Sequence, residues 1–277
     1  LLFYSLPYLR LLILALLIIT IAKPYSTTHF KNTEVEGIDI VIVKDISSSM
    51  LAEDLKPNRL KASKRVAETF IQERKNDRIG LVVFSGDGFT QCPITIDHGV
   101  LLNLLRDVET GMVDDGIAIG NGLAVGVNRL KESSAKSKVI ILLTDGENNA
   151  GEIDPITAAE LAKKYGIRVY TIGAGTYGKA PYPFKTPAGI IYETIDVKID
   201  EPLLKKIASI TNGKYFRATS TKGLQNIYHE INTLEKTIIE TTSYSKHKEY
   251  YHYLLIPALL LLFIELIIKY LISRRVI

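Results

Sequence analysis

Short apolar runs alternate with segments of helical periodicity through the middle of the chain. The runs are continuous and rich in β-branched residues, as expected of strands buried on both faces, and they occupy residues 38–43, 78–84, 138–143, 168–173 and, more briefly, 214–216. Apolar residues at helical spacing occupy residues 59–74, 99–105, 119–130, 155–165, 201–210 and 220–234. Strand–helix alternation of this kind predicts a doubly wound, Rossmann-like α/β fold with a mostly parallel sheet and helices on both faces.

Residues 174–198 interrupt this alternation. The segment Gly173–Lys179 follows a predicted strand, matches Gly-x-Gly-x-x-Gly and nearly matches a phosphate-binding loop. Both motifs need a helix N-terminus next, to offer free N–H groups to phosphate, whereas Ala180-Pro181-Tyr182-Pro183 follows. We therefore expect no nucleotide site here, but an irregular excursion with a hairpin that turns at Pro187-Ala188-Gly189.

A long apolar segment lies near the start of the chain. Leu11–Ala22 is an unbroken run of 12 residues, about 18 Å as a helix against about 30 Å of hydrocarbon. Including the residues before it allows a span and leaves Arg10 to reach the interface or to lie in a tight turn. A cleaved signal peptide is the alternative, but no small-x-small cleavage pattern precedes Lys23. We expect an anchor over residues 1–24, truncated because the sequence does not begin with methionine.

A stronger membrane helix is predicted over residues 250–273. Leu254–Ile268 is apolar apart from Glu265, and a buried helix of a water-soluble domain is the less favoured alternative. Glu265 and Lys269 are four residues apart, so we expect them on one side of the helix, where they can pair. The flanking residues are typical of a membrane boundary; they are Tyr250, Tyr251 and Tyr253 before the helix and Arg274 and Arg275 after it.

The basic residues at the two ends also indicate an orientation. By the positive-inside rule, Arg10 and the basic residues after the second helix lie in the cytoplasm. The segment between the helices then lies outside a bacterial inner membrane. Within it, residues 34–240 contain the whole strand–helix pattern and form the predicted globular domain.

Composition excludes several classes of protein. The formal charge of +4 is mild and Lys and Arg are scattered, which argues against nucleic-acid binding. A single cysteine, Cys92, excludes an intramolecular disulfide and a zinc cluster. The five histidines do not fall at metal-ligand spacing, no Gly-x-Ser-x-Gly is present, and adjacent acids such as Asp114 and Asp115 are usually solvated. We expect the chain not to be an enzyme.

Polar side chains follow two of the predicted strands. Asp45, Ser47 and Ser49 come directly after residues 38–43, a spacing that places one carboxylate and two hydroxyls on one side of a tight loop. Asp145 follows residues 138–143. In such sheets ligands bind at the carboxyl ends of strands, and hard oxygen ligands of low total charge suit Mg²⁺. Capping of the following helices is the alternative role, but two such loops in one sheet favour a metal site.

Further stretches combine into a specific pattern that covers nearly the whole chain. They are residues 36–50 (EGIDIVIVKDISSSM), 52–60 (AEDLKPNRL), 77–84 with 89–93 (FTQCP), 118–130 (AIGNGLAVGVNRL), 142–151 (LLTDGENNAG), 213–218 (GKYFRA) and the junction at Ala22-Lys23-Pro24. With these residues the chain resembles a von Willebrand factor A domain that carries a metal-ion-dependent adhesion site. More narrowly, it resembles the membrane-anchored Bat aerotolerance family of bacteria, which is associated with MoxR-type AAA ATPases.

The resemblance implies ligands for a divalent cation. Asp45, Ser47 and Ser49 would form the first loop of the site and Asp145 the third, with the aspartates acting largely through water. The second loop departs from the family pattern, because Ile117 stands where the family has a threonine. Lys44 also departs, since a cation beside the site opposes a bound metal. We therefore expect weak binding of Mg²⁺ or Mn²⁺.

The expected function is that of a membrane-anchored protein-binding module, in which an acidic side chain of a partner protein completes the metal shell. By resemblance, the partner belongs to an envelope stress or aerotolerance assembly with a MoxR-type ATPase. Two alternatives remain: a metal-free structural protein of a membrane assembly and, with less support because no positioned base is present, a metallohydrolase.

Overall fold

The computed structural model describes residues 2–21, 25–28, 37–187, 189–239, 246–249 and 252–273. The chain divides into two compact units. One comprises Glu34–Thr241, and the other joins Leu1–Thr33 to Thr242–Ile277.

A six-stranded sheet forms the centre of the Glu34–Thr241 unit, with the strand order β4-β3-β2-β5-β6-β9. Its strands are β2 (Asp39–Asp45), β3 (Arg78–Phe84), β4 (Gly88–Thr95), β5 (Lys138–Thr144), β6 (Ile167–Ala174) and β9 (Tyr215–Ala218). All neighbours pair in parallel except β3 and β4, which are antiparallel. The prediction of a mostly parallel sheet is confirmed.

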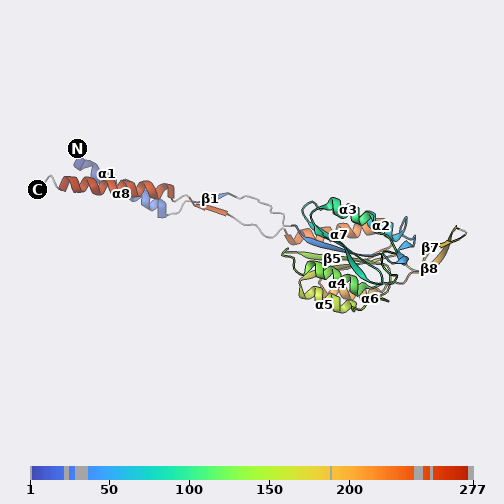
Figure 1. The fold of residues 1–277 in the computed structure, drawn as a ribbon. Helices are drawn as coiled ribbons and strands as arrows, with labels where there is room; N and C mark the ends of the chain where they lie inside the picture. The colour runs from blue at the N-terminus through green and yellow to red at the C-terminus, as the bar shows by residue number, and fades with distance from the viewer. Residues whose placement is uncertain are drawn as a thin grey trace. The chain divides into compact units, whose positions relative to one another are not determined.

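Helices cover both faces of this sheet (Figure 1). One layer contains α2 (Arg59–Gln72), α3 (His98–Arg106) and α7 (Thr221–Ile239), and the other contains α4 (Ile119–Leu130), α5 (Pro155–Lys164) and α6 (Glu201–Ile210). Strand β2 supplies both cores, because successive side chains of a strand point to opposite faces. Ile40 and Ile42 pack in one core and Val41 and Val43 in the other. The fold is therefore doubly wound, as predicted.

Two features of this unit go beyond the predicted alternation. Strand β4 was not predicted, because its mixed polar pattern and Pro93 are typical of an edge strand rather than of a buried one. The excursion after β6 is a regular antiparallel hairpin of β7 (Lys179–Thr186) and β8 (Gly189–Asp196). A hairpin was expected here, and Lys179 begins a strand rather than the helix that a phosphate site requires. Of the predicted turn, Ala188 lies outside the described residues.

The other unit contains α1 (Leu2–Ile21), β1 (Tyr25–Thr28), β10 (Lys246–Glu249) and α8 (His252–Ser273), and β1 pairs with β10. Here the expected Glu265–Lys269 pair is wrong: the Glu265 carboxylate forms an ion pair with Arg10 of α1. The Arg10 guanidinium thus pairs with an acid on the other helix. Arg10 itself lies within α1 and not in the tight turn that was considered for it. Within the described residues, the helices fall short of the length and apolar character needed to cross a membrane. The predicted boundary residues Tyr250, Tyr251, Arg274 and Arg275 and the junction Ala22-Lys23-Pro24 lie outside the described residues.

A buried carboxylate fixes the end of α7 to the sheet. Glu235 is fully buried and accepts hydrogen bonds from the hydroxyl of Tyr170 at 2.6 Å, from Ser137 Oγ at 2.8 Å and from the guanidinium of Arg168. One acid thus accepts hydrogen bonds from the residue that directly precedes β5 and from two residues of β6. Removing it leaves the buried hydroxyls of Tyr170 and Ser137 without their acceptor and the partly exposed guanidinium of Arg168 without its acid. The loss costs more than these interactions themselves contribute.

Glu235→Ala should therefore lower the free energy of unfolding by about 3–5 kcal/mol. Glu230 on the same helix provides a control, because its ion pair with Lys214 is largely exposed. Glu230→Ala should change stability by less than about 1 kcal/mol. Equilibrium urea unfolding followed by circular dichroism measures both, and equal losses in the two variants would contradict the role given to Glu235.

Candidate metal site

The four predicted site residues meet at the carboxyl ends of β2 and β5. Asp45 is the last residue of β2, Ser47 is the N-cap residue of the 3₁₀ helix η1 (Ser48–Leu51), and Ser49 lies within that helix. Asp145 directly follows β5. Because β2 and β5 are parallel neighbours in register, their carboxyl ends lie side by side.

Hydrogen bonds connect the two loops. Ser49 Oγ donates to Asp145 Oδ1 at 2.6 Å, and the hydroxyls of Ser47 and Ser49 are 2.9 Å apart. The backbone N–H of Ser47 donates to Asp45 Oδ1 at 2.9 Å, and Thr144 Oγ1 donates to Asp45 Oδ2 at 2.6 Å. The structure therefore brings all four predicted residues together and fixes the orientation of both carboxylates.

The two carboxylates are almost completely buried, Asp45 at 0% and Asp145 at 2% exposure. Burial raises the pKa of Asp45 to about 7, the charge of Asp145 adds to the increase, and hydrogen bonds from Ser47 and Thr144 oppose it. Burial likewise raises the pKa of Asp145, while Arg59 and Ser49 oppose it. Adjacent buried acids with hydroxyl oxygens beside them form a donor set that fits a hard divalent cation.

A buried arginine, Arg59, is the functional residue that sequence reasoning missed. Its Nη1 donates to Asp145 Oδ2 at 2.8 Å, and its Nε and Nη2 bind the two oxygens of Asp54, each at 2.7 Å. Arg59 is 1% exposed. A signal was available: a basic residue in the first turn of a helix opposes the helix dipole, so Arg59 needed an acid, and Asp54 precedes it by five residues.

The second loop contributes a carboxylate and an apolar side chain. Asp115 accepts from the backbone N–H of Ser48 at 3.0 Å and from its hydroxyl at 2.5 Å. Although partial burial raises the pKa of Asp115, these hydrogen bonds bring it below its ordinary value. Ile117 is 8% exposed, and its side chain fills the space where Gly146 lacks a Cβ. The position predicted to lack a hydroxyl therefore presents a methyl group to the third loop.

Lys44 is buried on β2, beside Asp45, and its ammonium group bonds to Ser63 of α2. Adjacent strand residues point to opposite faces, so the amine extends toward the α2 layer. Burial lowers the pKa of Lys44 to about 7, Lys64 adds to the decrease, and Asp45 opposes it. The predicted opposition of Lys44 to a bound metal is thus reduced, because burial disfavours the charged form of the amine.

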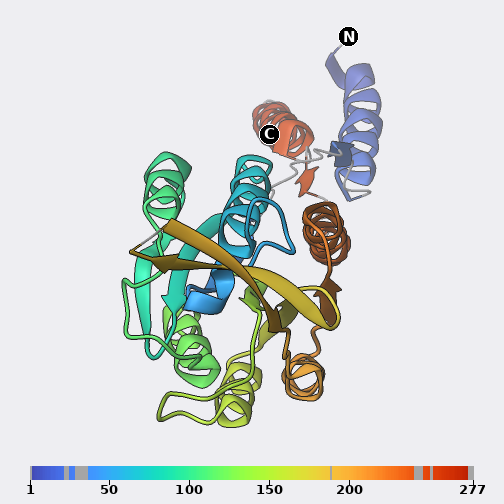
Figure 2. The same cartoon turned by 90° about the vertical axis from the view of Figure 1, so that its right-hand side faces the viewer.

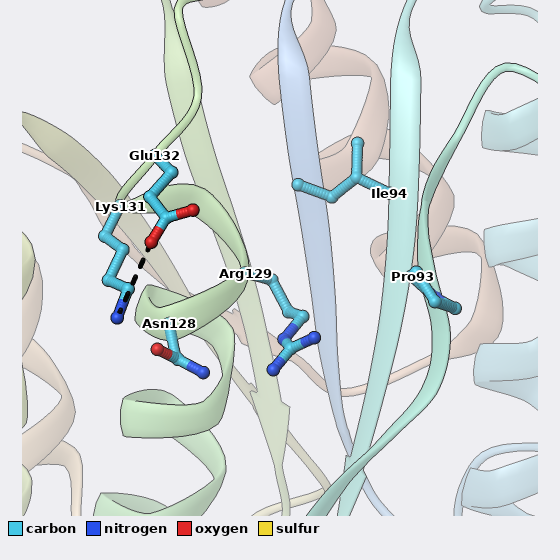
Figure 3. A pocket seen from close by; sticks show the side chains of 6 residues that line it. All are labelled: Pro93, Ile94, Asn128, Arg129, Lys131 and Glu132. Carbon is cyan, nitrogen blue, oxygen red and sulfur yellow. Dashed lines mark ion pairs between the residues drawn. The ribbon is translucent and has the colours of Figure 1, made fainter.

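One other depression in the described residues was considered as a binding site. A depression of about 310 Å³ is lined by residues of β4 and of the end of α4 (Figure 3): Pro93, Ile94, Asn128, Arg129, Lys131 and Glu132. Lys131 and Glu132 form an ion pair at 4.0 Å beside it. The start of α4 adjoins the strand-end site, so the length of this helix, about 18 Å, separates the two places. No group of three or more His, Cys, Asp or Glu side chains suited to a metal occurs in the described part of the chain.

Comparison with known families agrees with this geometry. Residues 39–230 match the von Willebrand factor type A domain family. The match covers more than half of the chain, so the protein belongs to this family, whose domains mediate protein–protein interactions.

Individual relatives indicate to which group within the von Willebrand factor type A family the chain is similar. An uncharacterized protein of Borreliella burgdorferi is 32% identical over 83% of this chain and 68% of its own length. The crystal structure of BatB from Bacteroides thetaiotaomicron is 32% identical and covers 72% of this chain and 100% of that one, with a TM-score of 0.64. The crystal structure of an aerotolerance-related membrane protein from Bacteroides fragilis is 30% identical. The match covers 71% of this chain and 98% of that one, with a TM-score of 0.63. The resemblance to the Bat family is therefore confirmed. The chain spans 60–68% of the length of three curated relatives that it matches.

The buried amine of Lys44 gives a pH-dependent expectation for the metal-free protein. The folded pKa of about 7 lies below the ordinary 10.5, so between these values the unfolded state binds more protons and stability rises with pH. Lys44→Met should abolish this rise and, at pH 7 in EDTA, increase the free energy of unfolding by about 1–4 kcal/mol.

Lys61→Met, at an exposed position of α2, is the matched control and should leave the pH dependence unchanged. Denaturant unfolding at several pH values between 7 and 9.5 provides the measurement. A Lys44→Met protein less stable than the unmodified chain at pH 7 would show that the ammonium is stabilising where it lies.

Proposed function

We propose that this protein is a membrane-anchored binding module that uses a divalent cation, Mg²⁺ or Mn²⁺, to bind an acidic side chain of a partner protein. The observation that carries the proposal is the group of Asp45, Ser47, Ser49 and Asp145 at the ends of two central strands. Burial of both acids, with hydroxyls within hydrogen-bond distance, supports a cation there rather than simple helix capping.

In this proposal the chain's own residues hold and orient the cation. The hydroxyls of Ser47 and Ser49 face one another and supply neutral oxygens, while Asp45 and Asp145 supply the negative charge. Thr144 and the N–H of Ser47 fix Asp45, and Arg59 fixes Asp145. The cation would supply positive charge at the surface, which attracts a carboxylate from the partner.

The second loop makes this site weaker than the family pattern. Ile117 replaces a hydroxyl by an apolar side chain, and the Asp115 carboxylate is already bound to Ser48. Asp115 could act as a replacement ligand only through the lone pairs that these two hydrogen bonds leave free.

A metal-free structural role is the second candidate, and Arg59 is the observation that favours it. Its guanidinium already neutralises one oxygen of Asp145 and both oxygens of Asp54. The strand-end site would then serve as a rigid surface for assembly. Hydrolysis has less support, because no histidine or other positioned base lies among the residues that contact these two acids.

The membrane anchor is supported by the surfaces of the two terminal helices. Large apolar side chains are exposed on both helices, among them Leu11, Leu14 and Ile18 on α1 and Leu259, Leu260 and Phe263 on α8, all at 54% or more. The Bacteroides fragilis relative is named a membrane protein. We place residues 34–240 outside the inner membrane between these anchors, in an aerotolerance assembly with a MoxR-type ATPase by resemblance to the Bat family.

Ile117→Thr should strengthen metal binding, because it restores a hydroxyl ligand at the second loop. One ligating contact to a charge corresponds to about 1–2 kcal/mol. Calorimetric titration of the protein with Mn²⁺ and Mg²⁺ measures the difference. Ile117→Val, which keeps an apolar side chain of nearly the same shape, is the matched control and should bind as weakly as the unmodified chain.

Asp45→Ala should abolish binding in the same titration. Tight binding by the unmodified protein that Ile117→Thr does not improve would mean that another group has taken the threonine's place. Binding that survives Asp45→Ala would exclude the proposed site, and absence of binding in every variant would favour the metal-free role.

The orientation of the C-terminal anchor gives a separate expectation. A reporter fused after Ile277 should have cytoplasmic activity, since Arg274 and Arg275 follow the apolar helix. Matched alkaline phosphatase and fluorescent protein fusions distinguish the two sides of the membrane. An active phosphatase fusion would reverse both the orientation and the compartment of the binding domain.

A further inference from the structure

The β7–β8 hairpin extends beyond the central sheet of its unit (Figure 1), and from the side shown in Figure 2 it lies in front of that sheet. Within the described residues its two strands pair only with each other. Three consecutive large side chains of β8 are open to solvent, Ile190 at 58%, Ile191 at 50% and Tyr192 at 58%. Exposed apolar side chains on a strand with an unpaired edge are typical of a surface that another chain covers.

The two outer edges of this hairpin differ in their backbone chemistry. The backbone N–H of Val197 donates to the carbonyl of Gly178 at 2.8 Å, so Gly178 and Val197 form a hydrogen-bonded pair. In an antiparallel ladder hydrogen-bonded and non-hydrogen-bonded pairs alternate, and this first pair therefore fixes the type of every later pair in the hairpin. Pro181 and Pro183 fall at the non-bonded pairs, so their nitrogens, which have no N–H, lie on the outer edge of β7. The carbonyl of Pro181 already accepts from the N–H of Glu53 at 2.8 Å. The edge of β7 is thus blocked.

The edge of β8 is free. Thr194 and Tyr192 stand opposite the two prolines, and Ile190 lies at the next position of the same kind. The N–H and C=O groups of these three residues therefore point away from β7. Strand β8 contains no proline and its register with β7 has no bulge, and no hydrogen bond to these backbone groups occurs within the described residues. Three alternate residues form an edge of the kind that accepts an added strand.

Charge decides what kind of strand fits this edge. The charged residues of β8 are both acids, Glu193 and Asp196, and both are exposed; Asp196 stands opposite Lys179 of β7, whereas Glu193 stands opposite Tyr182. A third carboxylate, Glu53, accepts a hydrogen bond from the hydroxyl of Tyr192 at 3.2 Å. We propose that the free edge of β8 binds an extended segment of a partner protein in which apolar and basic residues alternate. Its backbone would pair with Ile190, Tyr192 and Thr194, and its basic side chains would lie beside the acids.

The hairpin adjoins the candidate metal site. Glu53 and Asp54 are consecutive residues: the first contacts β7 and β8, and the second binds Arg59, which binds Asp145. Asp54 also accepts from the N–H of Thr176, at the base of the hairpin, at 2.8 Å. One partner can therefore reach both surfaces. The inference rests on the proposed binding function for the existence of a protein partner, but strand addition itself requires no metal.

A second copy of this chain is a poorer occupant. If two β8 strands paired with one another, all the charged side chains that these strands bring to the shared edge would be acidic, which is unfavourable. Self-association is accordingly one of the outcomes that the experiment must distinguish.

The experiment measures binding of a short fluorescein-labelled peptide of alternating lysine and isoleucine to the complete chain in EDTA, by fluorescence anisotropy. Thr194→Pro removes one outward N–H at a position of the kind that β7 already fills with proline, so the hairpin should persist. Thr194→Pro should weaken peptide binding roughly tenfold, whereas Thr194→Ala, which keeps the N–H, should change the affinity little. Glu193→Lys should shift the preference toward a peptide of alternating glutamate and isoleucine.

Equal binding to Thr194→Pro and Thr194→Ala, no preference between the two peptides, or no binding at all would overturn the proposal. So would binding that requires added Mn²⁺, which would assign the peptide to the metal site. Sedimentation of the unmodified chain as a dimer that Thr194→Pro dissociates would show that a second copy occupies the edge. Failure of metal titration alone would leave the peptide result intact, so the two proposals fail separately.

Discussion

Two aspartates lie buried side by side where β2 and β5 end, and the surrounding structure compensates for their charge. The hydroxyl of Thr144 donates to one oxygen of Asp45, and the hydroxyl of Ser49 donates to one oxygen of Asp145. The Arg59 guanidinium binds the remaining oxygen of Asp145. Arg59 in turn requires Asp54, which fixes the loop between η1 and α2. Since an unpaired buried charge is so costly, this ion-pair chain determines how the first loop, the third loop and the base of the hairpin are arranged.

The sheet acts as the support for this arrangement. Parallel pairing of β2 and β5 brings residues 45 and 145 together although they are far apart in sequence. The two apolar cores hold β2 from both faces, and Glu235 fixes α7 to the opposite end of the strands. Binding residues on loops held by such a rigid sheet can diverge, as Ile117 shows, without loss of the fold.

The parallel strands and the four strand-end residues were predictable, because continuous β-branched runs are a strong local signal and polar residues that directly follow two such runs meet at one edge of a parallel sheet. Strand β4 was not, since its pairing with β3 and not its own pattern makes it a strand. The partner of Glu265 was wrong for a similar reason: Arg10 lies far away in sequence, and spacing along one helix indicates only local partners. Arg59 was missed because, although Asp54 is close in sequence, its contact with Asp145 arises only when the fold brings β5 beside the start of α2.

The guanidinium of Arg59 keeps its proton under all physiological conditions, which gives the strand-end site a permanent resident cation. Domains that need a metal to fold collapse when a chelator removes it. Here part of the charge balance remains in the covalent chain, and two hydrophobic cores support the loops from below. If a cation binds at Asp45 and Asp145 as proposed, it would therefore enter and leave while the architecture persists, and its occupancy would act as a reversible signal rather than as a structural support.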